Sequence, residues 1–213
     1  GLLPIQNLNL LRFGFLSFVL GIAVVLANRF LRVHNEVENL NATLERKVEE
    51  RTNELQMTLT RVQELKVQQD GDYFLTSLLL EPLSAVNGSS SSVYIDSYTK
   101  QKKEFEFKGK KREIGGDIII SEKIELGGKT FIVFVNGDAM GKSIQGAGGA
   151  LVLGVVFLSV IKRTLSKEEY RSKSPERWLK DCFLELQSIF ESFDGTMLIS
   201  VVLGLIEEET GLL

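Results

Sequence analysis

Two aspartates, Asp117 and Asp138, are the residues whose types and spacing point most clearly to chemistry. They bound residues 118–126 and 129–137, two segments that carry apolar, β-branched runs. The pair Gly127-Gly128 separates these segments, and this arrangement predicts a β-hairpin with a two-residue turn. Counting outward from that turn places Asp117 directly opposite Asp138.

Two carboxylates in this arrangement would interact strongly. Side chains directly opposite each other on one face of an antiparallel pair have Cβ atoms roughly 4.5–5.5 Å apart. The two negative charges repel each other unless a cation lies between them or one carboxylate keeps its proton. Hard oxygen ligands favour Mg²⁺ or Mn²⁺, so the pair predicts a metal site. The alternative is that both aspartates only mark turn or strand-end positions, where aspartate is common.

The residues around both aspartates resemble a known protein family. The chain reads Gly115-Gly116-Asp117, then the hairpin, then Asp138-Ala139-Met140-Gly141-Lys142, and then a segment rich in small residues, 143–150. This pattern resembles the SpoIIE branch of the PPM (type 2C) metal-dependent protein serine/threonine phosphatases. The resemblance covers residues 68–213.

The resemblance implies an α+β fold of the PPM phosphatase type, which is a β-sandwich flanked by helices. It also implies a two-metal centre of Mn²⁺ or Mg²⁺ that activates water to attack a phosphoserine or phosphothreonine. Asp117 and Asp138 match two metal ligands of the family and would be catalytic through bound metal and water. Ala139 would contribute its backbone carbonyl to the metal. The implied substrate is a phosphorylated regulatory protein, such as an anti-sigma factor antagonist.

The sequence departs from the family at several points, and two bear on function. Ser143 stands where the family usually has glycine, and the later Asp-Gly and Asp-Asp metal segments do not occur before Leu213. We therefore expect the C-terminal part of the domain to lie outside this sequence. The departures also support an alternative from another class, a catalytically inactive phosphatase-like domain that acts as a dimeric signalling scaffold.

A phosphate-binding P-loop is a third hypothesis. Residues 137–143 end in Gly-Lys-Ser and lie between a predicted strand and a predicted helix. The P-loop motif needs its first glycine five residues before the second. That position is Asn136, so the sequence favours a metal site over a nucleotide site here.

The composition sets broad limits on function. The chain has 213 residues, of which 44% are hydrophobic and 25% charged, as is typical of globular proteins. Its net charge of −3 gives no electrostatic basis for binding nucleic acid. A single histidine, His34, cannot build a catalytic dyad or a histidine zinc site, and a single cysteine, Cys182, excludes an internal disulfide.

The N-terminal region predicts a membrane segment. Residues 13–28 carry no charge and are nearly all apolar, and arginines flank them on both sides. This length is near the lower limit for a helix that spans a bilayer. Arg29 and Arg32 at its C-terminal end place the following chain in the cytoplasm by the positive-inside rule. We expect residues 1–33 to be the last transmembrane helix of a larger sensor, with residues 10–33 in a bacterial inner membrane.

Residues 34–67 predict a coiled-coil signalling linker. Apolar or near-apolar residues recur at spacings of three or four, which is typical of a coiled-coil seam. The seam residues are Val33, Val37, Leu40, Leu44, Val48, Thr52, Leu55, Leu59 and Val62. Residues 44–55 also resemble the linker after the last membrane helix of bacterial seven-transmembrane receptors. We expect a homodimer through this segment, and the alternative is a single amphipathic helix that lies on its own domain.

The phosphatase-like region contains further predicted elements. We expect helices over residues 73–83, 143–161 and 175–193, and strands over residues 93–98, 104–107 and 196–206. The second of these helices is apolar enough to span a membrane, but its glycines favour a buried core helix. Ser174 and Pro175 predict the start of the third helix.

The remaining predictions concern burial and loops. The third helix is expected to bury an apolar stripe with spacings of three and four. Its members are Trp178, Leu179, Cys182, Phe183, Leu186, Ile189 and Phe190. The basic run over residues 108–112 is expected to be a solvated loop, and Asp194 is expected to be a turn residue.

Overall fold

The computed structural model describes residues 5–213 of the chain, with side chains from Leu11 onward. These residues divide into two compact units, and the division falls between Glu64 and Leu65. The sequence predicted a boundary between residues 67 and 68. One helix, α1 (Ile5–Leu80), supplies the described part of the first unit and continues into the second.

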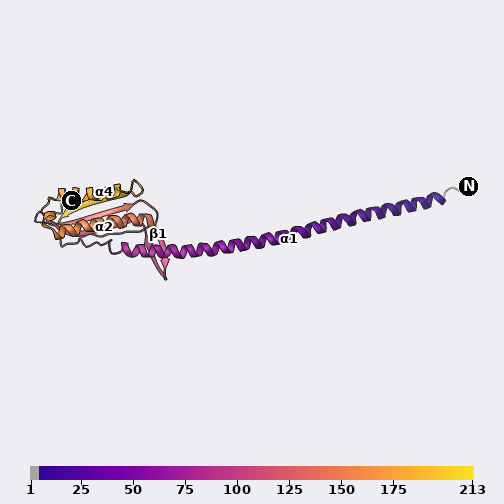
Figure 1. The fold of residues 1–213 in the computed structure, drawn as a ribbon, viewed down its shortest axis with the longest axis horizontal. Coiled ribbons are helices and arrows are strands. Elements are labelled where there is room, and N and C mark those ends of the chain that lie inside the picture. Colours follow the sequence, from indigo (N-terminus) through magenta and orange to yellow (C-terminus); the bar gives the residue numbers. More distant parts are fainter. Residues whose placement is uncertain (1–4) are drawn as a thin grey trace. The chain divides into compact units, whose positions relative to one another are not determined.

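The first unit consists of α1 up to Glu64, the indigo to purple helix in Figure 1. The helix is not interrupted at residues 33–34, where the membrane segment was expected to meet the linker. Its N-terminal part contains a window with mean hydropathy 1.9, long and apolar enough to cross a membrane. The seam residues are exposed, as Val33 (50%), Leu44 (51%) and Leu55 (65%) illustrate. The helical conformation predicted for residues 34–67 is confirmed, and the pairing of two such helices stays a prediction.

The second unit is built on a three-stranded antiparallel sheet in the order β3 (Asp117–Leu126), β4 (Lys129–Ala139) and β5 (Ile199–Glu207). The predicted hairpin is confirmed in its full register, with Leu126 paired to Lys129 at the turn. Gly127 and Gly128 have φ angles of 57° and 81°. Both angles lie in the left-handed region, which a primed two-residue turn requires and which glycine adopts without strain.

Two helices, α2 (Ile144–Ser166) and α4 (Pro175–Glu191), cover one face of this sheet, and the short α3 (Glu168–Arg171) connects them. The covered face carries alternate residues of β3 and β4, because successive side chains in a strand point to opposite faces. Its buried members are Ile118, Ile120, Ile124, Leu126, Phe131, Val133 and Val135. Leu153 and Phe157 of α2 are fully buried against them, which confirms that α2 is a core helix.

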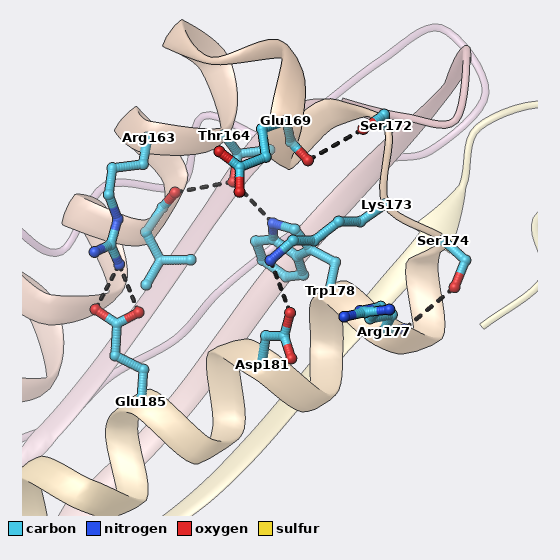
Figure 2. A network of polar contacts seen from close by, with 11 residues as sticks. Arg163, Thr164, Glu169, Ser172, Lys173, Ser174, Arg177, Trp178, Asp181 and Glu185 are labelled. Carbon is cyan, nitrogen blue, oxygen red and sulfur yellow. Dashed lines mark hydrogen bonds and ion pairs between the residues drawn. The ribbon is translucent and has the colours of Figure 1, made fainter.

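Polar contacts also join α2 to α4 (Figure 2). Trp178 Nε1 donates a hydrogen bond of 2.8 Å to Thr164 Oγ1, and Arg163 donates one of 2.6 Å to Glu185 Oε2. Ser174 Oγ accepts from the backbone N–H of Arg177 and caps α4, as its sequence predicted. The two helices are therefore held together by a buried indole and by a partly buried ion pair.

A second, two-stranded sheet is formed by β1 (Lys103–Phe107) and β2 (Lys110–Ile114). It packs against the last turns of α1 through two aromatic pairs. The ring centroids of Tyr73 and Phe105 lie 5.6 Å apart, and those of Phe74 and Phe107 lie 4.6 Å apart. The β1–β2 hairpin therefore contacts the end of α1 within the second unit, and the chain then leads directly into Gly115-Gly116-Asp117.

The α+β class is confirmed, since residues 5–213 form a three-stranded sheet and a two-stranded sheet that packs on α1. The PPM-type β-sandwich stays a prediction. Two other predictions for the second unit are corrected by the structure. Residues 93–98 form no strand, since their alternating residues find no neighbouring strand, and Tyr94 and Tyr98 are exposed. The helix expected over residues 73–83 is the end of α1, whose pattern continues through Gly71.

Two smaller corrections concern charge and burial. The basic run was expected to be a loop, but Lys108 and Gly109 form a turn and Lys110 begins β2. In α4 the buried residues are Trp178, Cys182 and Leu186, at steps of four. Phe183 is 52% exposed because it lies beyond the stripe that the sheet and α2 cover.

The single thiol gives a first testable prediction. Burial raises the pKa of the Cys182 thiol to about 12, and the nearby Glu185 carboxylate adds to the shift. Because the thiolate is the reactive form, we expect the folded chain to resist labelling by a thiol reagent at pH 8. In denaturant the thiol returns to a pKa of about 8.5 and reacts. Complete labelling within minutes in native buffer would contradict this burial.

Candidate functional site

Asp117 and Asp138 lie directly opposite each other at the open end of the β3–β4 hairpin. The next pair is joined by a hydrogen bond of 3.0 Å from Ala139 N to Gly116 O. Hydrogen-bonded and non-hydrogen-bonded pairs alternate along an antiparallel ladder. The aspartates therefore occupy a non-hydrogen-bonded pair, the type in which facing side chains come closest, with Cα atoms about 4.5 Å apart.

Both carboxylates project from the sheet face opposite to α2 and α4. Their neighbours along the strands, Ile118 and Gly137, are buried on the helix-covered side. Asp138 is exposed, and Asp117 is half-buried. Ser200 of β5 is the partner of Asp138 on its other side and continues the row. The row therefore presents two carboxylates and a hydroxyl on an accessible face.

The electrostatics of the pair match its geometry. Burial raises the pKa of Asp117 above its ordinary value of 3.8, and the facing carboxylate of Asp138 raises it further. Both effects disfavour the charged form of Asp117. A cation between the two carboxylates would reverse the second effect, because it favours the ionised form of each.

Glycines allow close packing of backbone around the pair. A Cβ on Gly116 would overlap with the carbonyl oxygen of Ala139. A Cβ on Gly146 in α2 would lie 3.0 Å from Gly116 N, and one on Gly149 would lie 2.6 Å from Ala139 Cβ. The first turns of α2 thus pack closely against the strand ends that carry both aspartates. This close packing explains why small residues follow Asp138 in the sequence.

Gln101 is a site residue that the sequence did not reveal. Its side-chain Nε2 donates a hydrogen bond of 2.7 Å to Asp117 O, and Asp117 N donates one of 3.4 Å to Gln101 Oε1. A Cβ on Gly115 would collide with this carboxamide. Gln101 lies in an irregular segment with no periodicity, so no sequence pattern pointed to it.

A cavity of about 260 Å³ lies beside Asp117. Its walls include the last turn of α1, β2 and Gln101. Arg112 of β2 lines it, donates a hydrogen bond of 3.0 Å to Glu81 and lies 5.4 Å from the ring centroid of Phe74. The guanidinium of Arg112 therefore lies near Asp117 but already forms an ion pair with Glu81.

The structure brings together two of the acidic ligands that the resemblance implied. Within the described part of the chain, no group of three or more His, Cys, Asp or Glu side chains is placed to hold a metal. Asp194 lies in a turn with φ 48°, as predicted, and takes no part in the pair. The residues at hand therefore provide carboxylates for one cation and do not complete a two-metal centre.

Comparisons with protein-family models, with curated proteins and with solved structures give no match for this chain. These comparisons therefore assign no role to Asp117, Asp138 or Ala139.

Proposed function

We propose that this chain is part of a divalent-cation-dependent protein serine/threonine phosphatase in bacterial signal transduction. Its substrate would be a phosphorylated regulatory protein, such as an anti-sigma factor antagonist. The observation that carries the proposal is the Asp117–Asp138 pair, two facing carboxylates on an accessible sheet face at the start of α2. The PPM-like β-sandwich stays part of the proposal, with β3–β5 as one of its sheets.

The residues present fit one Mn²⁺ or Mg²⁺ ion. Asp117 and Asp138 offer hard carboxylate oxygens on adjacent strands, and their repulsion falls when a cation binds. Ala139 would add its backbone carbonyl, as the resemblance to the SpoIIE-type phosphatases implies. Water would complete the shell, as is usual for Mg²⁺. A second ion, which the resemblance implies, needs acidic ligands beyond this pair.

A bound divalent cation supplies a water of lowered pKa and neutralises charge on the phosphoryl oxygens. Asp117 and Asp138 would hold and orient that ion. Asp138 is exposed, so a phosphorylated segment of another protein has access to the pair. Cys182 is buried on the helix-covered side of the sheet, so its thiol is not available as a nucleophile.

The first unit would connect this domain to a membrane signal. We propose that residues 10–33 lie in a bacterial inner membrane, with the phosphatase domain in the cytoplasm. Residues 34–67 would pair with a second copy as a coiled coil and form a homodimer. The continuous α1 and its exposed apolar seam support this proposal.

The test is hydrolysis of a phosphoserine peptide by the full chain in detergent micelles, with and without Mn²⁺, beside Asp138→Asn. We expect metal-dependent activity in the wild type and none in the variant. Asp194→Asn is the matched control, because it makes the same change in an exposed turn that takes no part in the pair. Equal activity in Asp138→Asn and wild type would refute the site.

Stability without a substrate gives a second readout of the pair. We expect Asp138→Asn to stabilise the metal-free chain by about 0.2–1 kcal/mol, because it removes a like charge directly opposite Asp117. Mn²⁺ should raise the melting temperature of the wild type and leave that of the variant unchanged. Thermal denaturation in EDTA and in Mn²⁺ measures both effects. A lower melting temperature for the variant in EDTA would contradict repulsion between the two aspartates.

The inactive scaffold is a second candidate. It is favoured by the finding that the described residues offer two acidic ligands and no third. In that case the folded chain binds no Mn²⁺ by calorimetry and hydrolyses no phosphopeptide, yet it still dimerises through residues 34–67. Sedimentation of the same sample separates this outcome from a misfolded protein.

A further inference from the structure

The outer edge of β3 has two different partners along its length. At Ser121 the partner is main chain: Ser121 N donates to Ala85 O at 3.0 Å, and Asn87 N donates to Ser121 O at 2.9 Å. Asp117 lies four residues earlier on the same edge, and its N–H and C=O point away from β4 because its pair is non-hydrogen-bonded. There the partner is a side chain, that of Gln101.

The Gln101 carboxamide acts on Asp117 as a neighbouring peptide group would. It donates to Asp117 O at 2.7 Å and accepts from Asp117 N at 3.4 Å, so it occupies both main-chain groups of one residue. Gln101 is itself held, because its backbone N–H donates to Glu113 Oε2 at 2.8 Å. Gly115 provides the space in which the carboxamide lies.

We propose that Gln101 is a positioning residue for the cation site, which fixes the backbone of Asp117 and so aims its carboxylate at that of Asp138. This inference rests on the proposed metal-binding function of the pair. Asp117 begins β3 and directly follows Gly115 and Gly116, which restrain the chain least. Without Gln101, the N–H and C=O of Asp117 lose their only protein partners on the outer edge among the described residues. The start of β3 would then fray, and the two carboxylates would lose their fixed separation.

The test compares Gln101→Met, which keeps the side-chain length and removes both hydrogen bonds, with the wild-type full chain. Groups that support metal ligands typically change metal affinity by 10–100-fold. We expect the Mn²⁺ dissociation constant from calorimetry to rise by about that factor. We also expect amide hydrogen exchange to become faster in peptides that cover residues 115–119, and to stay unchanged around Ser121.

Two further variants sharpen the result. Gln187→Met is the matched control, because Gln187 is an exposed glutamine with a side-chain hydrogen bond to Glu191. It should leave Mn²⁺ affinity and exchange over residues 115–119 unchanged. Gly115→Ala displaces the carboxamide without deleting it, and it should reproduce the effects of Gln101→Met.

The outcomes separate this inference from the proposed function. Wild-type Mn²⁺ affinity in a folded Gln101→Met variant would overturn the positioning role. If the wild type binds no Mn²⁺, the metal site fails, and the role of Gln101 in metal binding fails with it. Faster exchange over residues 115–119 in Gln101→Met would in that case still show that Gln101 secures the backbone of Asp117. Unchanged exchange would overturn that contact as well.

Discussion

Replacing Trp178 with alanine should cost the second unit about 3–5 kcal/mol of unfolding free energy, the usual range for a buried aromatic residue. Trp178 is 2% exposed and fills the space between α2, α4 and the sheet. The change also removes the indole donor to Thr164 Oγ1 (Figure 2). Domains are commonly stable by about 5–15 kcal/mol, so this loss would leave the unit marginal.

The measurement needs a probe other than tryptophan fluorescence, because Trp178 is the only tryptophan in the chain. Circular dichroism is also a poor probe, since the 76 residues of α1 contribute much of the helical signal. Labelling of Cys182 against urea concentration reports on the second unit itself, because this buried thiol lies one turn from Trp178. The midpoint should fall strongly in Trp178→Ala.

Phe183→Ala is the control for this experiment. It makes a similar truncation on the same helix, but Phe183 is 52% exposed. We expect a loss below about 1 kcal/mol, because little apolar area leaves the core. Equal losses in the two variants would show that the buried stripe of α4 is assigned wrongly.

The hairpin was predictable because two independent signals agreed on it. The apolar segments favour strands, and Gly127-Gly128 allows only a narrow set of turns. Once the turn is fixed, the period of two leaves no freedom in the register, so the pairing of Asp117 with Asp138 followed. The helix α4 was predictable for a similar reason, since Ser174 and Pro175 mark its start and its apolar residues recur at helical spacing.

Other structural features could not be predicted from the sequence, because they depend on contacts with residues far along the chain. Residues 93–98 alternate like a strand, but a strand also needs a neighbour, and their sequence does not provide one. Phe183 fits the helical stripe, yet its burial depends on how far the sheet extends under α4. Gln101 contacts the backbone of Asp117 and not its side chain, so the identity of its partner leaves no trace in the sequence.

Gly116→Ala is expected to disrupt the site and the hairpin together. The new Cβ would overlap with the carbonyl oxygen of Ala139. Neither atom can move without a shift of the backbone that carries it. No rotamer change relieves such a clash, so β3 and β4 must separate where Asp117 faces Asp138. We expect a loss of roughly 1–3 kcal/mol or more, as for other overpacked positions, and loss of Mn²⁺ binding.

Gly148→Ala tests whether this effect is specific to the contact. Gly148 lies in α2, and a Cβ there would meet only Met197 Cε, at an ordinary distance of 3.8 Å. Alanine is favoured over glycine in a helix by about 0.8–1 kcal/mol, so this variant should be more stable than the wild type. The two Gly→Ala changes, one next to β3 and one in α2, would thus act in opposite directions. Cys182 labelling in urea measures the stability of both variants, and calorimetry measures their Mn²⁺ binding. Destabilisation of both variants would mean that the small residues serve the packing of α2 in general. Opposite signs, with Mn²⁺ binding lost only in Gly116→Ala, would mean that the close approach of Gly116 to Ala139 holds the two aspartates in place.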